Sequence, residues 1–451
     1  MRISIEMSID IRNYLYLLCE QGADTTALQE RLSELEERVE KEQRGESREW
    51  RELEREVYEL AQSWTTDEPS DLEAIRTARP QQRIDALPGA LDDATVRDKV
   101  GGGWYGRIAG CILGKPVECL MKEKDSRAAL RKLLDESGEY PIRDFISEKT
   151  ILPYWESLGT APSWFTPGSG NPSLREYLRF APADDDLNYT VLSLDVLERH
   201  GREFSPDQLL DSWIALLSYN SVCTAEKLAY RNRVMGLGWP ETATFVNPYG
   251  EWIGAQIRAD AYGYVCPMRP EEAAAMAWAD AASSHVKNGI YGAMWVAAAI
   301  AAAYGESDPK AIVARGLEQV PATCRFTEHV RRTVAVAERN GDDFEATFDD
   351  INQRLGEYHC VHTINNACVV AAALIHGGHD LGRVISIAVM GGLDTDCNGA
   401  TAGSIAGVMV GETAIAPQWK DPFNDTLYTA VRGRSEQRIS ALIDETVKRI
   451  D

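Results

Sequence analysis

Two aspartates stand one residue apart in a stretch that otherwise holds mainly glycine, alanine and other small residues. The stretch, GGLDTDCNGATAGSIAG, covers residues 391–407 and contains Asp394 and Asp396. Glycines recur every four residues from 399 to 407, a spacing that places them on one helix face and lets a second helix approach closely. Either acid alone could be a helix cap. Two acids with no Lys or Arg in the adjoining sequence instead predict ligands of a hard divalent cation.

A second group of acids lies in the middle of the chain. Asp184, Asp185 and Asp186 directly precede Leu187, the first residue of an apolar stripe at helical spacing that continues to 197. One N-cap residue is enough to start a helix, and three adjacent carboxylates repel one another. A bound metal ion would remove that repulsion, so this group also predicts metal ligands.

A third stretch, GRIAGCILGKPVECL, covers residues 106–120 and has glycines every four residues, followed by a Lys-Pro break and Glu118. Taken alone, this pattern is typical of another closely packed helix that ends at Pro116, with Glu118 on the surface. Its place in the order of the three stretches gives it a second interpretation.

A small-residue helix followed by Glu, an Asp-Asp pair opening a helix, and a late Gly-Gly-x-Asp-Thr-Asp motif opening a Gly/Ala helix occur here in that order. In this the chain resembles the ADP-ribosylglycohydrolase family, all-helical hydrolases that carry a pair of Mg²⁺ or Mn²⁺ ions. The resemblance extends over roughly residues 97–445, and its most specific motif is the last one.

The resemblance implies roles for individual residues. Glu118 matches an early Glu that lies beside the metals and is linked to water activation and substrate positioning. Asp185 and Asp186 match the paired metal-binding aspartates, and Asp394 and Asp396 match the late pair, of which the second can bridge the two ions. The expected metal ligands are therefore Asp184, Asp185, Asp186, Asp394 and Asp396, and the expected catalytic residues are Glu118 and Asp186.

Three positions depart from the family pattern. Asp184, Leu187 and Cys397 stand where threonine is common in the family. Asp184 still offers an oxygen, whereas Leu187 offers no ligand atom and a thiol is a poor ligand for a hard cation. These differences indicate a divergent member in which one metal site is weakened or a water replaces the missing side chain.

Five further polar residues are candidates for binding the substrate. His285 and Asn288 stand at a break between two predicted helices, His362 and Asn366 stand at the start of another, and Arg258 could pair with a phosphate. Asn and His near a metal could hold ribose hydroxyls. The alternative for each histidine is a helix cap or a satisfied core group.

The elements that must position these residues are helices. Apolar residues at helical spacing predict a hairpin over 26–65, residues 66–95 read as a linker, and nearly every periodic segment after 97 is helical. We therefore predict an all-α fold, a compact orthogonal helical bundle, with an N-terminal helical extension and linker over 1–95 and a catalytic domain over 96–451. Two long aromatic-rich stretches, 138–182 and 236–254, are expected either to shape a pocket or to pack on their own aromatics.

Composition limits the possible partners. The 451-residue chain carries a formal net charge of -23, and such a field repels phosphate backbones and anionic membranes, so we expect neither a nucleic-acid polymer nor a membrane as partner. Nine scattered cysteines without a C-x-x-C pair and no signal-peptide pattern in the first thirty residues lead us to expect a cytoplasmic protein.

The expected function is metal-dependent hydrolysis, with Mg²⁺ or Mn²⁺ as cofactor. The resemblance implies cleavage of a glycosidic bond at the ribose anomeric carbon of an ADP-ribosyl or related nucleotide or nucleoside substrate. The alternative is a catalytically inactive protein of the same fold that binds metal and nucleotide. A third possibility is a structural helical protein whose acids are only caps.

Overall fold

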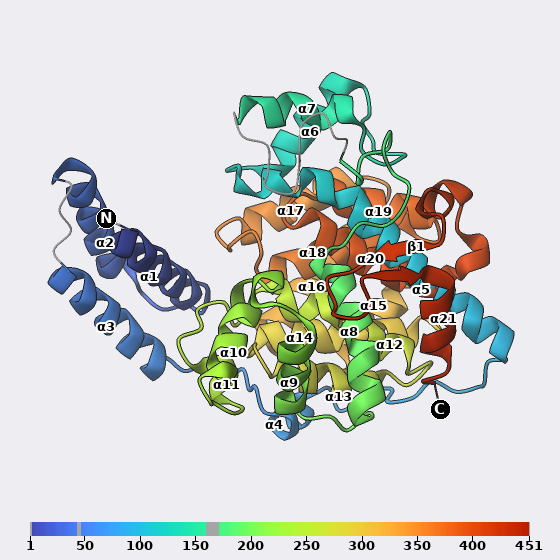
Figure 1. The fold of residues 1–451 in the computed structure, drawn as a ribbon, viewed down its shortest axis with the longest axis horizontal. Coiled ribbons are helices and arrows are strands. Elements are labelled where there is room, and N and C mark those ends of the chain that lie inside the picture. Colours follow the sequence, from blue (N-terminus) through green and yellow to red (C-terminus); the bar gives the residue numbers. More distant parts are fainter. Residues whose placement is uncertain (1, 43–46, 159–170, 451) are drawn as a thin grey trace.

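The chain folds into helices along almost its whole length, as the computed structural model shows (Figure 1). The structure describes residues 2–42, 47–158 and 171–450. In the N-terminal half the helices are α1 (Arg2–Glu20), α2 (Thr26–Glu42), α3 (Ser47–Ser63), α4 (Leu72–Ala78), α5 (Asp93–Gly114), α6 (Ser126–Ser137), α7 (Glu148–Ser157), α8 (Asp185–His200), α9 (Pro206–Leu216), α10 (Thr224–Val234) and α11 (Glu241–Thr244).

The C-terminal half continues in the same way. Its helices are α12 (Asp260–Tyr264), α13 (Pro270–Ala281), α14 (Asn288–Ala302), α15 (Pro309–Leu317), α16 (Arg325–Asn340), α17 (Phe344–Leu355), α18 (Thr363–Gly377), α19 (Leu381–Met390), α20 (Thr395–Val410) and α21 (Ile439–Val447). Short 3₁₀ helices are η1 (Lys115–Lys122), η2 (Tyr219–Ser221), η3 (Ile253–Arg258), η4 (Glu412–Ala414), η5 (Pro417–Trp419) and η6 (Asp421–Phe423). Strands β1 (Thr426–Tyr428) and β2 (Glu436–Arg438) pair antiparallel. The predicted all-α class is confirmed.

Helices α5 and α20 pack backbone against backbone at the centre of the molecule. A Cβ atom built on Gly106 would lie 2.1 Å from the carbonyl oxygen of Gly403, and one on Gly110 would lie 1.9 Å from that of Gly399. Only glycine fits at such a distance. The four-residue glycine spacing therefore lets the two helices approach closely, as the sequence predicted. This contact brings the end of α5 to the beginning of α20.

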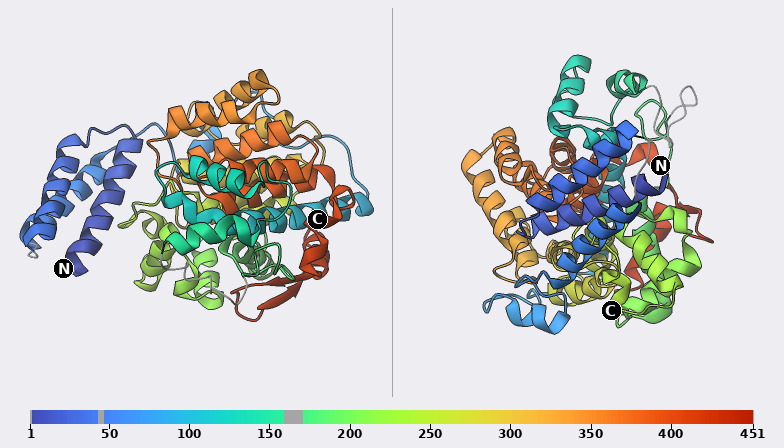
Figure 2. Two further views of the ribbon diagram at one scale, coloured as in Figure 1. Left: turned by 90° about the horizontal axis from the view of Figure 1, so that it is seen from above. Right: turned by 90° about the vertical axis from the view of Figure 1, so that its left-hand side faces the viewer.

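The N-terminal helices α1, α2 and α3 stand to one side of the main body (Figures 1 and 2). They share a small hydrophobic cluster of their own, in which Leu15, Leu32 and Leu35 pack with Trp50 and Leu53. Most of the other described positions of α2 and α3 are exposed. The predicted hairpin over 26–65 is present as α2 and α3.

Several segments differ from the sequence prediction. Helix α1 was not anticipated, the expected linker 66–95 contains α4, and the expected loop 138–182 contains α7. Asp71 caps α4 by accepting a hydrogen bond from the backbone N–H of Ala74, so a short capped helix formed among the prolines. The part of the loop from 159 to 170, with Trp164 and Phe165, lies outside the described residues. Within the described parts of the chain, no helix is long and apolar enough to cross a membrane.

Candidate metal centre and active-site cavity

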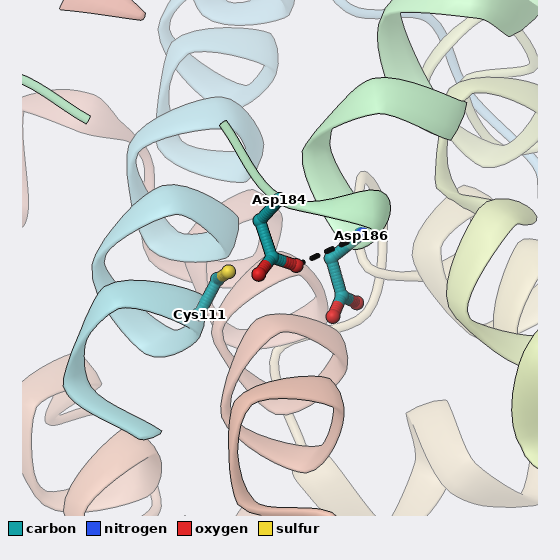
Figure 3. Close-up of side chains that lie close together, drawn as sticks. All are labelled: Cys111, Asp184 and Asp186. Atoms are coloured by element: carbon teal, nitrogen blue, oxygen red, sulfur yellow. Dashed lines mark hydrogen bonds between the residues drawn. The ribbon is translucent and has the colours of Figure 1, made fainter. Parts of the chain in front are cut away.

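Three helix ends bring the acidic residues together. Asp184 is the N-cap of α8, and its Oδ1 accepts a hydrogen bond of 3.1 Å from the backbone N–H of Asp186 (Figure 3). Asp394 occupies the N-cap position of α20, but its side chain makes no capping hydrogen bond. Capping therefore accounts for Asp184 and leaves the Asp394 carboxylate without that role.

The turn before Asp394 is held in an unusual backbone conformation. Gly392 and Leu393 have φ angles of 71° and 58°, and the Ser126 hydroxyl accepts a 3.0 Å hydrogen bond from the Leu393 N–H. Asn366 Oδ1 accepts hydrogen bonds from the Asp394 N–H at 3.3 Å and from the Asn398 side chain at 2.8 Å. Asn366, expected to contact substrate, thus supports the turn that carries the late acid pair.

A lysine that the sequence analysis did not single out lies among the acids. Lys115 Nζ is 2.8 Å from Asp184 Oδ2, 2.9 Å from Glu118 Oε2 and 3.0 Å from Asp396 Oδ2. It therefore joins all three acidic stretches. The available signal was its place directly after the last small-residue turn and three residues before Glu118, since residues three apart on a helical segment are neighbours.

A fully buried arginine, also not anticipated, faces the middle group of acids. Arg107 lies 3.2 Å from Asp186 Oδ1 and 3.0 Å from Asp260 Oδ2, and both side chains of each pair have no exposed surface. Its guanidinium also donates to the Thr190 hydroxyl at 2.7 Å and to the carbonyl of Ile257. One oxygen of Asp186 is therefore already paired inside the core.

The remaining acid oxygens fit a hard cation. Asp186 Oδ2, Asp394 Oδ1 and Asp396 Oδ1 are buried and have no hydrogen-bond partner among the described residues. Such atoms are costly unless a cation or a proton compensates them. Asp394, Asp396 and Cys397 each offer one atom within 4.8 Å of the others, as do Cys111, Asp184 and Asp186. Carboxylate oxygens are the donors that Mg²⁺ and Mn²⁺ prefer.

The two thiols are poor partners for such an ion. Burial, together with nearby aspartates, raises the pKa of Cys111 and of Cys397 well above that of an ordinary thiol. The thiolate is the form that ligates metals, and sulfur is a soft ligand that suits Mg²⁺ or Mn²⁺ poorly. The carboxylates are therefore the better candidates for ligands.

The acids are strained electrostatically without an added cation. Burial, reinforced by the Asp396 charge, raises the pKa of Asp394 well above its ordinary range, and burial with the Asp184 charge raises the pKa of Asp185 to about 7. Burial would also raise the pKa of Asp184, but its ion pair with Lys115 holds that pKa below the ordinary value. Burial and the Asp396 charge raise the pKa of Glu118 to about 8.

A cavity of about 140 Å³ opens beside these acids. Its volume is below the roughly 300–1,000 Å³ of a site that encloses a whole drug-sized ligand, so it has room for only part of such a ligand. The lining combines acids with aromatic and apolar side chains: Glu118, Met121, Asp185, Tyr189, Cys223, Thr224, Glu226, Trp252, Ile253, Gly254, Ile257, Val361, Asp394, Asp396 and Cys397. Trp252, Ile253 and Gly254 come from the aromatic-rich stretch 236–254. Asp186, expected to be catalytic, is not in this lining.

Arg258 and His285 lie behind the cavity wall. Arg258 is buried, donates to Asp280, and its Nη1 lies 2.5 Å from Glu226 Oε1. His285 Nδ1 is 2.8 Å from the Ser284 hydroxyl, and burial beside Arg258 lowers the pKa of His285 well below that of an ordinary histidine. Both residues are therefore partners in a buried polar network.

Asn288 and His362 lie near the N-terminal extension. Asn288 donates to Glu68 at 2.8 Å and to Glu251 at 2.7 Å. His362 is the N-cap of α18, where its Nδ1 accepts a 3.1 Å hydrogen bond from the Ile364 N–H. This is the capping alternative that the sequence had left open for a histidine.

Among the described residues, the cavity lining contains none of the five side chains expected to bind substrate. The structure uses them as caps, as turn supports or as partners of buried carboxylates. A substrate-binding role for Arg258, His285, Asn288, His362 and Asn366 stays a prediction.

The N-terminal extension contacts the same wall of the cavity. The ring of Trp252 stacks on His359 with centroids 4.2 Å apart and an interplanar angle of 15°, and His359 in turn meets the edge of Tyr16 in α1. Gln21 donates a 2.6 Å hydrogen bond to Glu251, next to Trp252. The extension therefore supports a loop that lines the cavity.

Comparison with known proteins identifies the family and the fold. A sequence model described as ADP-ribosylglycohydrolase matches residues 92–450. A solved structure titled "ADP-ribosylglycohydrolase-related protein complex" is 18% identical, with a TM-score of 0.50, covering 79% of this chain and 99% of that one. At this identity the likeness supports the fold alone. The comparison with curated proteins gave no match. Because the family match spans most of the chain, this protein belongs to the ADP-ribosylglycohydrolase family.

Proposed function

We propose that this protein is a metal-dependent hydrolase that cleaves a glycosidic bond at the ribose anomeric carbon of an ADP-ribosyl or related nucleotide or nucleoside substrate. The observation that carries the proposal is the cavity in which Glu118, Asp185, Asp394 and Asp396 meet. We further propose a reduced, cytoplasmic setting, since all nine cysteines are free.

The cavity would receive the terminal ribose, with the rest of the substrate outside. Trp252 and Tyr189 supply apolar walls for the sugar ring, and Asp185 places a carboxylate beside it. Negative charge near the anomeric carbon stabilises an oxocarbenium-like transition state. A bound Mg²⁺ or Mn²⁺, held by Asp394 and Asp396, would supply positive charge that fixes vicinal hydroxyls or a water.

Glu118 is the preferred general base because it lines the cavity, whereas Asp186 lies behind it, paired with Arg107. Its carboxylate would accept a proton as the water oxygen bonds to the anomeric carbon and the leaving group departs with the electrons of the broken bond. Burial and the Asp396 charge raise the pKa of Glu118, and a cation held by Asp396 would lower that pKa again, toward the range in which the carboxylate can accept a proton.

The test is release of free ADP-ribose or ribose from a panel of ADP-ribosyl peptides and nucleosides, with Mn²⁺, Mg²⁺ or a chelator. Asp394→Asn should lower the rate on the order of 10³-fold, equivalent to about 4 kcal/mol of barrier. The matched control is Asp342→Asn, whose side chain is fully exposed and should leave the rate unchanged. Equal rates for Asp394→Asn and wild type, or activity indifferent to chelator, would refute the mechanism.

A second candidate is a protein that binds metal and nucleotide without cleaving it. Lys115 favours this candidate because its ammonium group lies 2.9 Å from the Glu118 carboxylate. That ion pair occupies the carboxylate that would otherwise accept the proton from water. A nucleotide that binds with Mn²⁺ in calorimetry but is never hydrolysed would select this candidate.

A further inference from the structure

Lys115 holds a position among the acids that a metal ion would otherwise suit. Its Nζ lies within 2.8 to 3.0 Å of one carboxylate oxygen from each of Asp184, Glu118 and Asp396. An ammonium group has three donors and no acceptor, so three converging carboxylates satisfy it completely. Its side chain is 19% exposed, and it therefore makes these contacts largely out of water.

The backbone sets the place of this ammonium group. Gly114, directly before Lys115, touches the first turn of α20 so closely that an added Cβ would lie 2.4 Å from the backbone nitrogen of Asp396. Lys115 begins η1, and Pro116 follows in its first turn. Lys115 is therefore anchored where α5 meets α20, and its side chain reaches the acids of α8 and α20 from that point.

The two carboxylate oxygens of Asp396 face two different cation positions. Its Oδ2 accepts a 3.0 Å hydrogen bond from Lys115 Nζ, whereas its Oδ1 has no hydrogen-bond partner among the described residues. Asp394 Oδ1 is likewise buried without such a partner, and both acids line the cavity. One position of the centre is thus filled by the protein's own ammonium group, and the second faces the cavity.

We propose that Lys115 takes the place of one of the two divalent cations, so that this chain binds a single ion, between Asp394 and Asp396 and facing the cavity. The inference rests on the proposed metal-dependent function, and it reduces the pair of ions that the family resemblance implies to one ion. Arg107 has a parallel effect on the middle acids because it holds one oxygen of Asp186 in a buried ion pair. Lys115 and Arg107 therefore bring the protein's own positive charge to Asp184 and to one oxygen of Asp186.

The test counts bound Mn²⁺ per chain by equilibrium dialysis and records its electron paramagnetic resonance spectrum. Wild type should bind one Mn²⁺ with an isolated six-line spectrum. Lys115→Met keeps the length of the side chain and removes its charge, so it should bind two ions with an exchange-coupled spectrum. Lys122→Met, an exposed lysine of the same 3₁₀ helix, is the matched control and should still bind one ion.

The outcomes separate this inference from the proposed function. Two exchange-coupled ions in wild type would overturn the role of Lys115 and leave metal-dependent hydrolysis standing. One ion in a folded Lys115→Met, or in Lys115→Gln if the first variant does not fold, would overturn it as well. No bound ion in wild type would overturn both. The wild-type count is decisive even if neither variant folds.

Discussion

Substituting Gly110 by alanine tests how far the metal centre depends on the contact between α5 and α20. The added Cβ would lie 1.9 Å from the carbonyl oxygen of Gly399, whereas an ordinary contact needs about 3.4 Å or more. The helices would have to separate by about 1.5 Å at this point. Shortening a side chain of α20 cannot relieve the clash, because the contact is with the backbone of Gly399, which has no side chain.

The expected loss of stability is the difference between two opposing effects. Overpacking of a tight contact destabilises the folded protein by about 1–3 kcal/mol. Replacing glycine by alanine inside a helix stabilises it by about 1 kcal/mol. The free energy of unfolding should therefore fall by up to about 2 kcal/mol. The effect on the site should be larger, since a displacement of about 1 Å can cost on the order of 100-fold in rate.

Thermal unfolding, Mn²⁺ affinity and hydrolysis would be measured on the same preparations. Gly110→Ala should lower the melting temperature modestly and weaken Mn²⁺ binding strongly, because Gly110 lies five residues before Lys115 and contacts Gly399 near the start of α20. Gly238→Ala is the control, since its added Cβ would make an ordinary contact of 3.5 Å with Asp207. Unchanged Mn²⁺ affinity in Gly110→Ala would refute the idea that this glycine contact sets the geometry of the acids.

Two further predictions concern buried charges away from the cavity. Arg107→Met leaves Asp186 and Asp260 without their buried partner, and the free energy of unfolding should fall by about 3–5 kcal/mol; a loss below about 1 kcal/mol in chemical denaturation would contradict this. Burial, opposed by the His359 N–H, raises the pKa of Glu20 to about 8 in the folded protein from an ordinary value of 4.5. Because the folded state holds this proton more tightly, stability should fall as pH rises from about 4.5 to 8, by up to about 5 kcal/mol, and then level off. Glu20→Gln should remove that contribution, so its melting temperature should exceed that of wild type at pH 8.5 by more than at pH 5; parallel pH profiles would argue against the assignment.

Helical periodicity and small-residue spacing were sufficient to predict the all-α class and the hairpin of α2 and α3, because both depend on neighbours three and four residues apart. Helix α1 was not predicted from the sequence, and neither was its contact with the cavity wall through Tyr16 and His359. That contact joins residues more than 300 positions apart, and no local pattern encodes such a distance.

The acid stretches were visible in the sequence because carboxylates and glycines at these spacings have a chemical meaning before any fold is known. What each acid faces was decided only by tertiary packing. Arg107 of α5 and Lys115, directly after α5, neutralise acids that lie 69 to 281 positions later in the chain. Charge compensation acts over a few ångströms in space and is indifferent to distance along the chain, so the number of cations left to bind depends on the folded arrangement.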